Sequence, residues 1–297
     1  MTLYVSDLDG TLLDPQARLS AITRAGLVNL LDEGLVFTVA SARHVMSIRK
    51  ILGDLPLRLP VISSNGAYIS DLATGRHELV NAMPPALGRD IVALMQSRGF
   101  TPFASTHGPL GDQLFVEAIS NPGQQHFVDQ RTREQDERLR RSTRLHDELV
   151  DPAVTVVLID RMDALLDLQA ALVAQFGDAV ETHVADDLYQ PDWPWMSVHD
   201  RRASKDQAIT TLAERYGLEA REIVVFGDHV NDVSMLRAAH RGIAMGNAIE
   251  AVKREAHAVI GHHAEDSVLR FIEADWRRAG EAATTGASAC RSHAAAR

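Results

Sequence analysis

The acidic pair Asp7 and Asp9 stands in the segment Asp7-Leu8-Asp9-Gly10-Thr11, directly after a short apolar run from Leu3 to Ser6. Side chains two residues apart on an extended chain point the same way, so both carboxylates should face one cleft. Two carboxylates this close repel each other unless a cation lies between them or one is protonated. Because Mg²⁺ prefers oxygen ligands, the pair predicts a magnesium site. The alternative is an Asp- and Gly-rich turn that merely closes a loop.

A second acidic segment, Gly227-Asp228-His229-Val230-Asn231-Asp232, also follows an apolar run, Val224 to Phe226. Asp228 is expected at a strand end, as Asp7 is, and Asn231 and Asp232 are expected to open the next helix. Helix capping is the alternative, since Asn and Asp are preferred capping residues. Capping accounts for Asn231 or Asp232 but not for Asp228, which would add a third acid to the metal site.

Two further residues could hold an anion. Ser41 ends the apolar run Leu35 to Ala40, where a hydroxyl and the backbone amides of a turn suit a phosphate oxygen. A helix cap is the alternative for Ser41. Lys205 stands near the start of a predicted helix. The helix dipole favours acids over cations there, so a lysine at this position is a candidate for holding an anion. A lysine on the protein surface is the alternative for Lys205.

The elements around these residues follow two styles. Apolar strands alternate with amphipathic helices up to about Val80 and again after Ser204, which is typical of βαβ units around a parallel sheet. Pro60 to Ser63 is expected to be the third of these strands. Between the two stretches, alternating strands and helices predict an α+β insert with an antiparallel sheet.

We therefore predict the α/β fold class, with a Rossmann-like, doubly wound parallel sheet as the core. In such sheets ligands bind at the carboxyl ends of the strands, where the acidic segments lie. The core is expected over residues 1–82 and 191–275, and the inserted domain over 83–190. The tail, 276–297, is rich in alanine and contains Cys290, and we expect it to be flexible.

Composition excludes several classes of function. The chain has 297 residues, with 30 basic and 40 acidic side chains and a formal net charge of −10, which argues against nucleic acid as the main ligand. It has no apolar stretch of the ~18 residues that a membrane span requires, and no basic region opens a signal peptide. One cysteine cannot form an intramolecular disulfide. We expect a cytoplasmic protein that does not bind membranes.

The order and spacing of these segments resemble the haloacid dehalogenase superfamily, specifically its Cof-type phosphatases. The resemblance covers about residues 2–275. Four motifs of the superfamily and two supporting features of the family carry it: DLDGT at 7–11, Ser41, Lys205, GDHVND at 227–232, SNGA at 64–67 and MGNA at 245–248.

The resemblance implies roles for the acidic residues. Asp7 would be the nucleophile that takes the phosphoryl group, and also a Mg²⁺ ligand. Asp9 would protonate the leaving oxygen and then activate water, while its backbone carbonyl binds the metal. Asp228 would be the third protein ligand, and Asp232 would support the site from behind the ligands.

The same resemblance implies that Ser41, Lys205, Asn231 and the backbone amides around Leu8 and Ala42 hold the phosphate. This agrees with the charge that a phosphoryl transition state spreads over its oxygens, which Mg²⁺ and Lys205 would neutralise.

The expected function is the Mg²⁺-dependent hydrolysis of a small phosphomonoester, such as a sugar phosphate or another phosphorylated metabolite, through an aspartyl-phosphate. The inserted domain would be a cap that selects the substrate. A phosphomutase of the same superfamily and a non-catalytic sugar-phosphate-binding protein are the alternatives. The acid/base residue Asp9 argues against the second, because a binding protein has no need of one. Oligomeric state and the identity of the substrate stay open.

Overall fold

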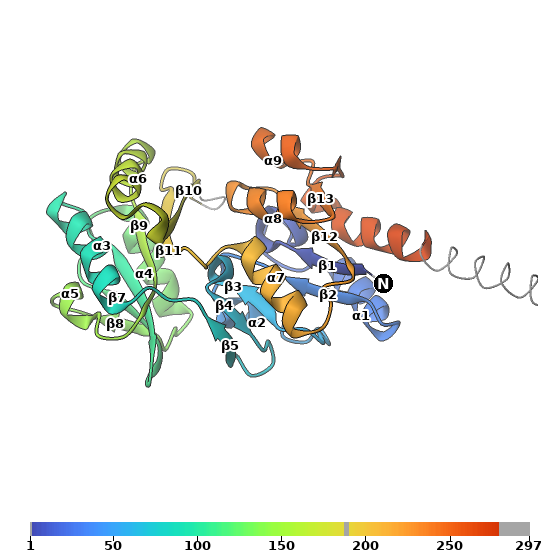
Figure 1. The fold of residues 1–297 in the computed structure, drawn as a ribbon, viewed down its shortest axis with the longest axis horizontal. Helices are drawn as coiled ribbons and strands as arrows, with labels where there is room; N and C mark the ends of the chain where they lie inside the picture. Colours follow the sequence, from blue (N-terminus) through green and yellow to red (C-terminus); the bar gives the residue numbers. More distant parts are fainter. Residues whose placement is uncertain (1, 187–189, 279–297) are drawn as a thin grey trace, which may run out of the picture. The chain divides into compact units, whose positions relative to one another are not determined.

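The computed structural model describes residues 2–186 and 190–278, and the chain divides into two compact units (Figure 1). The first unit comprises residues 1–40, 47–60 and 213–297, and the second comprises 41–46 and 61–212. Most of the alanine-rich tail, with Cys290, lies outside the described residues. The predicted boundaries of the core and the inserted domain stay predictions.

The first unit contains a five-stranded parallel sheet with the strand order β14-β13-β12-β1-β2. Residues 3–5 of β1 and 224–226 of β12 are at most 1% exposed, so these adjacent strands are buried on both faces. This is the pattern that their continuous apolar runs predict. The strands are β1 (Thr2–Ser6), β2 (Val36–Val39), β12 (Glu222–Gly227), β13 (Arg241–Ala244) and β14 (Ala258–Val259).

Helices alternate with these strands along the chain. Helix α1 (Ala21–Asp32) begins where the Ser20 hydroxyl accepts a hydrogen bond from the backbone N–H of Thr23, and the chain leaves it through Gly34 at φ +100°. The other helices of this unit are α8 (Val233–Ala238), α9 (Glu250–Glu255) and a helix over 267–278. Two helices begin in the second unit and end in the first, α2 (Val45–Leu52) and α7 (Lys205–Arg215).

The second unit contains a six-stranded sheet with the order β10-β11-β9-β6-β7-β8. Its pairings are antiparallel except for that of β7 with β8, which is parallel. The sheet has the antiparallel character that the sequence predicts. Its strands are β6 (Phe103–Gly108), β7 (Gly111–Val116), β8 (Leu139–Arg141), β9 (Ala153–Ile159), β10 (Val180–Ala185) and β11 (Trp195–Asp200).

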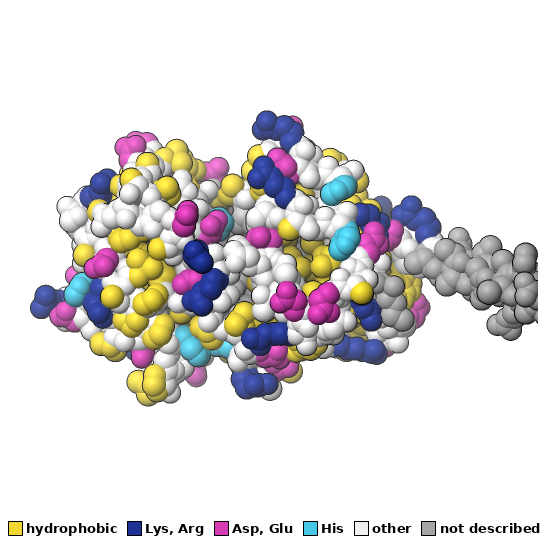
Figure 2. Space-filling model, in the orientation of Figure 1, with side chains coloured by type: hydrophobic (Ala, Val, Ile, Leu, Met, Phe, Trp, Pro, Cys, Tyr) yellow, Lys and Arg dark blue, Asp and Glu magenta, His cyan; other side chains and the backbone are white. Residues whose placement is uncertain are grey.

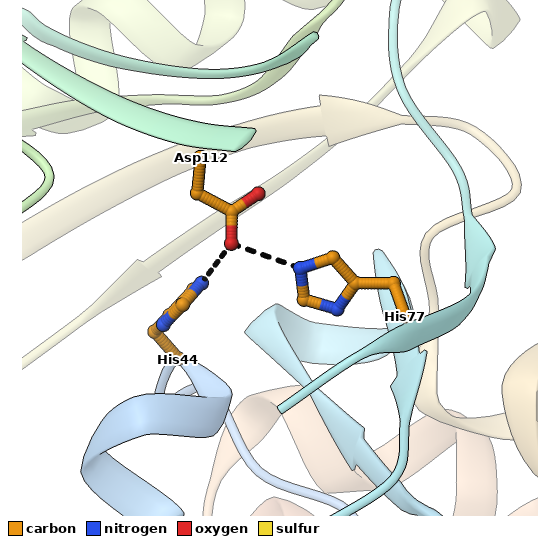
Figure 3. A group of neighbouring side chains, drawn as sticks. All are labelled: His44, His77 and Asp112. Atoms are coloured by element: carbon orange, nitrogen blue, oxygen red, sulfur yellow. Dashed lines mark hydrogen bonds and ion pairs between the residues drawn. The ribbon is translucent and has the colours of Figure 1, made fainter. Parts of the chain in front are cut away.

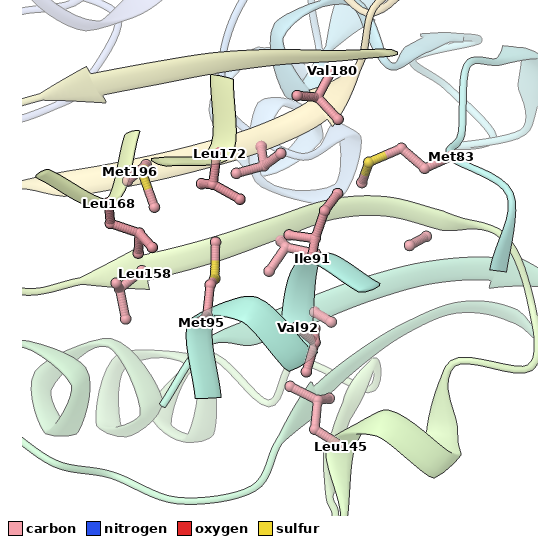
Figure 4. Close-up of a cluster of buried hydrophobic side chains, with 14 of the residues drawn as sticks. Met83, Ile91, Val92, Met95, Leu145, Leu158, Leu168, Leu172, Val180 and Met196 are labelled. Carbon is pink, nitrogen blue, oxygen red and sulfur yellow. The ribbon is translucent and has the colours of Figure 1, made fainter. Parts of the chain in front are cut away.

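A core of buried aliphatic and methionine side chains packs helices against this sheet (Figure 4). Ile91, Val92 and Met95 from α3 are fully buried in the same cluster as Leu158 of β9 and Met196 of β11. Burial of apolar area at about 25 cal/mol per Å² makes such a cluster the main source of this unit's stability. Its helices are α3 (Pro85–Ser97), α4 (Pro122–Arg133), α5 (Leu145–Glu148) and α6 (Met162–Phe176).

A three-stranded antiparallel sheet, β3-β4-β5, completes the second unit. It corrects one expectation, because β3 (Val61–Ser63) pairs with β4 (Tyr68–Ser70) and not with a strand of the parallel sheet. The chain reverses through residues 64–66, which all have positive φ, and β5 (His77–Val80) follows β4. An apolar run of three residues predicts a buried strand but does not specify its partner.

Within the described residues, no helix is both long and apolar enough to cross a membrane. Figure 2 shows basic and acidic side chains interspersed over the described part of the face that it draws. The basic side chains on that face therefore lie scattered among acidic ones, as expected for a chain with a net charge of −10.

Candidate active site

The segment after β1 places its acidic residues at the carboxyl end of the parallel sheet. The backbone N–H of Asp7 donates to the carbonyl of Phe226 at 2.9 Å, which continues the pairing of β1 with β12. Asp7 is 6% exposed, whereas Asp9 is partly exposed. Gly10, at φ +73°, then turns the chain away from the sheet. This conformation is one that glycine adopts readily, and it explains the residue type at this position.

Asp228 follows the neighbouring strand β12, and its side chain is held by the segment after β1. The Thr11 hydroxyl donates to Oδ1 of Asp228 at 3.1 Å, and Asp228 is 4% exposed. Because β1 and β12 are adjacent and parallel, their carboxyl ends lie at the same edge of the sheet. Thr11 therefore links the two acidic segments that the sequence singled out.

Asp232 accepts hydrogen bonds from the backbone that precedes it. Its Oδ2 accepts from the N–H of Asp228 at 2.9 Å and from that of His229 at 3.0 Å, and Asp232 is fully buried. The bond from the His229 N–H is one half of a capping box at the turn Val230–Asp232, so Asp232 does take part in capping, as the alternative held. The second bond, from the N–H of Asp228, goes beyond capping. Gly227 fits closely here, because a Cβ at that position would lie 2.5 Å from Cβ of Asp232. The contacts fix the loop that carries Asp228.

The carboxylates of Asp7, Asp228 and Asp232 form one buried cluster. Each offers an oxygen that lies within 4.8 Å of the oxygens of the other two. Buried negative charges at this separation repel one another unless a cation compensates them. The donor set consists of oxygens alone, which suits a hard divalent ion such as Mg²⁺. These residues therefore fit the predicted metal.

Two residues predicted to contact phosphate also lie in these segments. Leu8 is fully buried and its carbonyl accepts from the N–H of Leu13 at 2.9 Å, which fixes the peptide units around it. Asn231 is partly buried, in the turn between β12 and α8.

Ser41, Ala42 and Lys205 belong to the second unit, so their approach to the acidic cluster stays a prediction. Ser41 is 1% exposed and its hydroxyl accepts from the N–H of Arg43 at 3.2 Å, in a turn that precedes α2. This bond lies outside the helix, so the helix-cap alternative for Ser41 is wrong. Ala42 is exposed.

Lys205 is 1% exposed, which excludes the surface alternative. Burying an ammonium group is costly unless it is paired and hydrogen-bonded, so such a residue is rarely incidental. One loop brings Lys205 and Ser41 toward each other. Asn65 donates its N–H to the Ser41 carbonyl at 3.0 Å, and a Cβ on Gly66 would lie 2.7 Å from the carbonyl carbon of Ser204.

Asn247 is a positioning residue whose contacts sequence reasoning missed. Its Nδ2 donates to the carbonyl of Gly10 at 2.8 Å, and its Oδ1 accepts from the N–H of His263 at 3.0 Å. The sequence marks it only as part of the segment 245–248. Its place just after β13, at the same edge of the sheet as Asp7 and Asp228, is the signal that could have found it.

The geometry of the acidic cluster agrees with the family that the whole chain resembles. The model of the haloacid dehalogenase-like hydrolase family matches residues 4–272. The chain belongs to this family. The resemblance predicted from the motifs is thereby confirmed.

Curated relatives of the chain are phosphatases. It is 29% identical over 274 residues to the pyridoxal phosphate phosphatase of Escherichia coli (strain K12), covering 90% of this chain and 95% of the relative. It is 30% identical over 273 residues to the HMP-PP phosphatase of Enterobacter sp. (strain 638), covering 91% and 94%. Family and relatives confirm the prediction of a hydrolase of phosphoric monoesters.

Solved structures confirm the predicted fold class. A crystal structure of a protein from Thermotoga maritima matches with a TM-score of 0.72 at 26% identity, covering 91% of this chain and 96% of the other. A haloacid dehalogenase-like hydrolase from B. subtilis matches with a TM-score of 0.75 at 22% identity, covering 92% and 99%, which bears on the fold alone.

Proposed function

We propose that this hydrolase acts on a small phosphomonoester with Mg²⁺ and an aspartyl-phosphate intermediate. The observation that carries the proposal is the cluster of buried carboxylates of Asp7, Asp228 and Asp232 at the end of two adjacent parallel strands. Asp7, Asp228 and the backbone carbonyl of Asp9 would hold the ion, with Asp232 fixing the loop behind Asp228. When bound, Mg²⁺ would supply positive charge against the carboxylates and against the phosphoryl oxygens.

The chain's own residues would carry the chemistry in two steps. In the first, a carboxylate oxygen of Asp7 forms a bond to phosphorus as the bond to the leaving oxygen breaks, and Asp9 gives its proton to that oxygen. In the second, Asp9 takes a proton from water, whose oxygen bonds to phosphorus and releases inorganic phosphate from Asp7. Dividing the reaction in this way replaces one difficult displacement with two easier ones.

Phosphate would be held by Ser41, Lys205, Asn231 and the backbone amides around Leu8 and Ala42. The burial of Ser41 and Lys205 supports this assignment, because a buried hydroxyl and a buried ammonium beside one loop suit an anion. A dry environment also strengthens their attraction for the charge that develops on the phosphoryl oxygens.

The domain over residues 83–190 would be the cap that selects the substrate. Its support is a hydrophobic core made mostly of these residues, together with Met196 and Val198 of β11, which lets the domain vary its surface without disturbing the parallel sheet. The named substrates of relatives suggest where to look first. Relatives hydrolyse pyridoxal phosphate and 5-amino-6-(5-phospho-D-ribitylamino)uracil, which both join a nitrogen-containing ring to a phosphate. We propose a substrate of similar size, a phosphorylated metabolite that is neither a nucleic acid nor a lipid.

Phosphate release from a panel of phosphorylated metabolites tests the proposal. The panel contains these two compounds and several sugar phosphates, with Mg²⁺ or with EDTA. We expect release that needs Mg²⁺ and is lost in Asp228→Asn. The matched control is Asp178→Asn, which removes an exposed acid of the second unit. Release that persists in EDTA, or that Asp228→Asn leaves unchanged, would contradict the metal-dependent mechanism.

A further inference from the structure

Three histidines contact Asp112 in the second unit, two of which Figure 3 shows, and the group takes no part in the proposed hydrolysis. Nε2 of His44 and Nε2 of His77 each lie 2.8 Å from Oδ2 of Asp112. Nδ1 of His107 lies 2.8 Å from the other oxygen, Oδ1, which also accepts from the Tyr68 hydroxyl at 3.0 Å. We call these four residues, His44, His77, His107 and Asp112, the histidine cluster.

The histidine cluster is assembled from separate elements. His107 and Asp112 face each other across the β6–β7 hairpin, where they are paired in register. His77 begins β5, and His44 directly precedes α2. The side chains of His44, His77 and Asp112 are 10%, 7% and 13% exposed, and that of His107 is 33% exposed. The polar atoms therefore meet in a largely dry place that remains open on the His107 side.

The donor atoms converge in the way that a metal site requires. One oxygen of Asp112 and the ring nitrogens of His44 and His77 all lie within 4.8 Å of one another. Imidazole nitrogens with one carboxylate are a common donor set for Zn²⁺, at about 2.0–2.2 Å from the ion. In a tetrahedral site these bond lengths would separate the donors by roughly 3.3 Å. The observed 2.8 Å contacts would need to open by about half an ångström.

A partner for the second ring nitrogen of His77 is already in place. The Ser70 hydroxyl lies 2.7 Å from Nδ1 of His77. Histidine ligands usually use the nitrogen that faces away from the metal to donate a hydrogen bond, which fixes the tautomer and the ring orientation. Nδ1 of His44 has a weaker contact, 3.3 Å from the N–H of Met46, which belongs to the tautomer with hydrogen on Nε2. Metal binding at His44 would require the other tautomer and the loss of this long contact.

We propose that the histidine cluster is a binding site for a divalent transition metal, with Zn²⁺ as its ligand. His44, His77 and Asp112 bind the ion, and His107, whose Nδ1 lies 2.8 Å from the other oxygen of Asp112, holds that carboxylate in place. The site joins the tip of the β6–β7 hairpin to β5 and to the start of α2, so that the metal acts as a cross-link between these elements. The proposal does not depend on the proposed function, since its residues differ from those of the acidic cluster.

Zn²⁺ binding to the full chain tests the site. The protein is stripped of metal, and Zn²⁺ is titrated in excess Mg²⁺, so that Mg²⁺ competes for the acidic cluster. Bound zinc is counted by elemental analysis after gel filtration. We expect one Zn²⁺ per chain. His77→Gln and Asp112→Asn should weaken binding by more than about 100-fold, the upper end of the cost of losing a residue that only supports a ligand.

Three further variants locate the ion. Ser70→Ala keeps every ligand and should weaken binding about 10–100-fold through the orientation of His77. His126→Gln, the control, removes an exposed histidine of α4 and should change nothing. Asp7→Asn should also leave zinc binding intact.

Zinc should raise the midpoint of thermal unfolding of the wild type but not that of His77→Gln. If His77→Gln fails to fold, Ser70→Ala carries the test. No zinc bound in the presence of Mg²⁺, binding that every variant retains, or binding lost only in Asp7→Asn would overturn the proposal.

Discussion

The backbone of Gly10 lies directly against the carboxylate of Asp228. A Cβ placed on Gly10 would lie 2.8 Å from Cγ of Asp228 and closer still to Oδ2. The contact joins the turn after β1 to the end of β12, and the Thr11 hydroxyl that donates to Oδ1 holds the same carboxylate from the next residue. Gly10 thus serves two needs, a backbone with positive φ and room for an acidic side chain.

Gly10→Ala should therefore damage activity beyond its cost in stability. A non-glycine residue at this φ costs about 1–2 kcal/mol in the free energy of unfolding. The added methyl group must also displace Asp228, and a misplacement of about 1 Å in a catalytic site can lower turnover about 100-fold. Urea denaturation and Mg²⁺-dependent phosphate release measure the two effects separately.

Gly34→Ala is the matched control for this variant. Gly34 has φ +100°, but a Cβ there would meet no heavy atom within 4 Å. It should lose a similar free energy of unfolding while turnover stays at the wild-type level. Equal turnover in the two variants would show that Gly10 matters for backbone conformation alone.

Two substitutions of Asp232 should separate its structural role from its electrostatic role. Asp232→Ala leaves the N–H groups of Asp228 and His229 without their acceptor, and a buried unsatisfied donor costs about 1–3 kcal/mol. Asp232→Asn keeps an oxygen that can accept both bonds, so it should recover most of the stability. Mg²⁺ affinity, measured by titration calorimetry, should fall about 10–100-fold in Asp232→Ala and less in Asp232→Asn. If Asp232→Ala had the same free energy of unfolding as the wild type, the hydrogen bonds that Asp232 accepts would not stabilise this loop.

The acidic cluster could be predicted from the sequence because each of its segments is recognised from the residues next to it in the chain. Asp7 and Asp228 each follow a continuous apolar run, and neighbouring parallel strands end at the same edge of a sheet. Once two such runs are assigned to one sheet, their terminal residues are brought together without further knowledge. The burial of Lys205 was less accessible, since a lysine near a helix start is more often solvated.

The histidine cluster could not be predicted in this way. His44, His77 and Asp112 meet only because a hairpin folds back onto a separate three-stranded sheet, and no periodicity or spacing in the chain encodes that contact. The pairing of β3 with β4 has the same origin. Strand propensity and burial can be inferred from residue types, but the choice of partner depends on the turn at 64–66 and on long-range packing.

His199 should make the protein less stable in acid. It lies fully buried in β11, and burial, with a smaller contribution from nearby His183, lowers its pKa to about 3, although the Val154 backbone opposes this shift. Between pH 3 and the ordinary value near 6.5, the unfolded chain binds a proton at this residue and the folded chain does not. Stability therefore falls as pH drops through this range, by up to about 1.4 kcal/mol per pH unit.

His199→Leu should remove that share of the pH dependence. Urea unfolding of the wild type and the variant at several values between pH 4 and 7.5 gives the two slopes, and their difference isolates His199 from the other titrating groups. Above pH 7 the slopes should coincide, which serves as an internal control. Identical slopes between pH 4 and 6 would contradict a buried neutral histidine.

Asp7→Asn and Asp9→Asn should separate the nucleophile from the acid/base residue. Asp7→Asn removes the nucleophile, so neither phosphoenzyme nor turnover should appear. Asp9→Asn keeps the nucleophile and the backbone carbonyl, but loses acid–base assistance that is typically worth ~10²–10⁴-fold. An aryl phosphate needs little acid help to leave, while the attack of water still needs the base. Asp9→Asn should therefore accumulate acid-stable, base-labile phosphate on Asp7 when labelled aryl phosphate is used. Label on a serine or histidine, or wild-type turnover in Asp7→Asn, would show that the reaction takes another route.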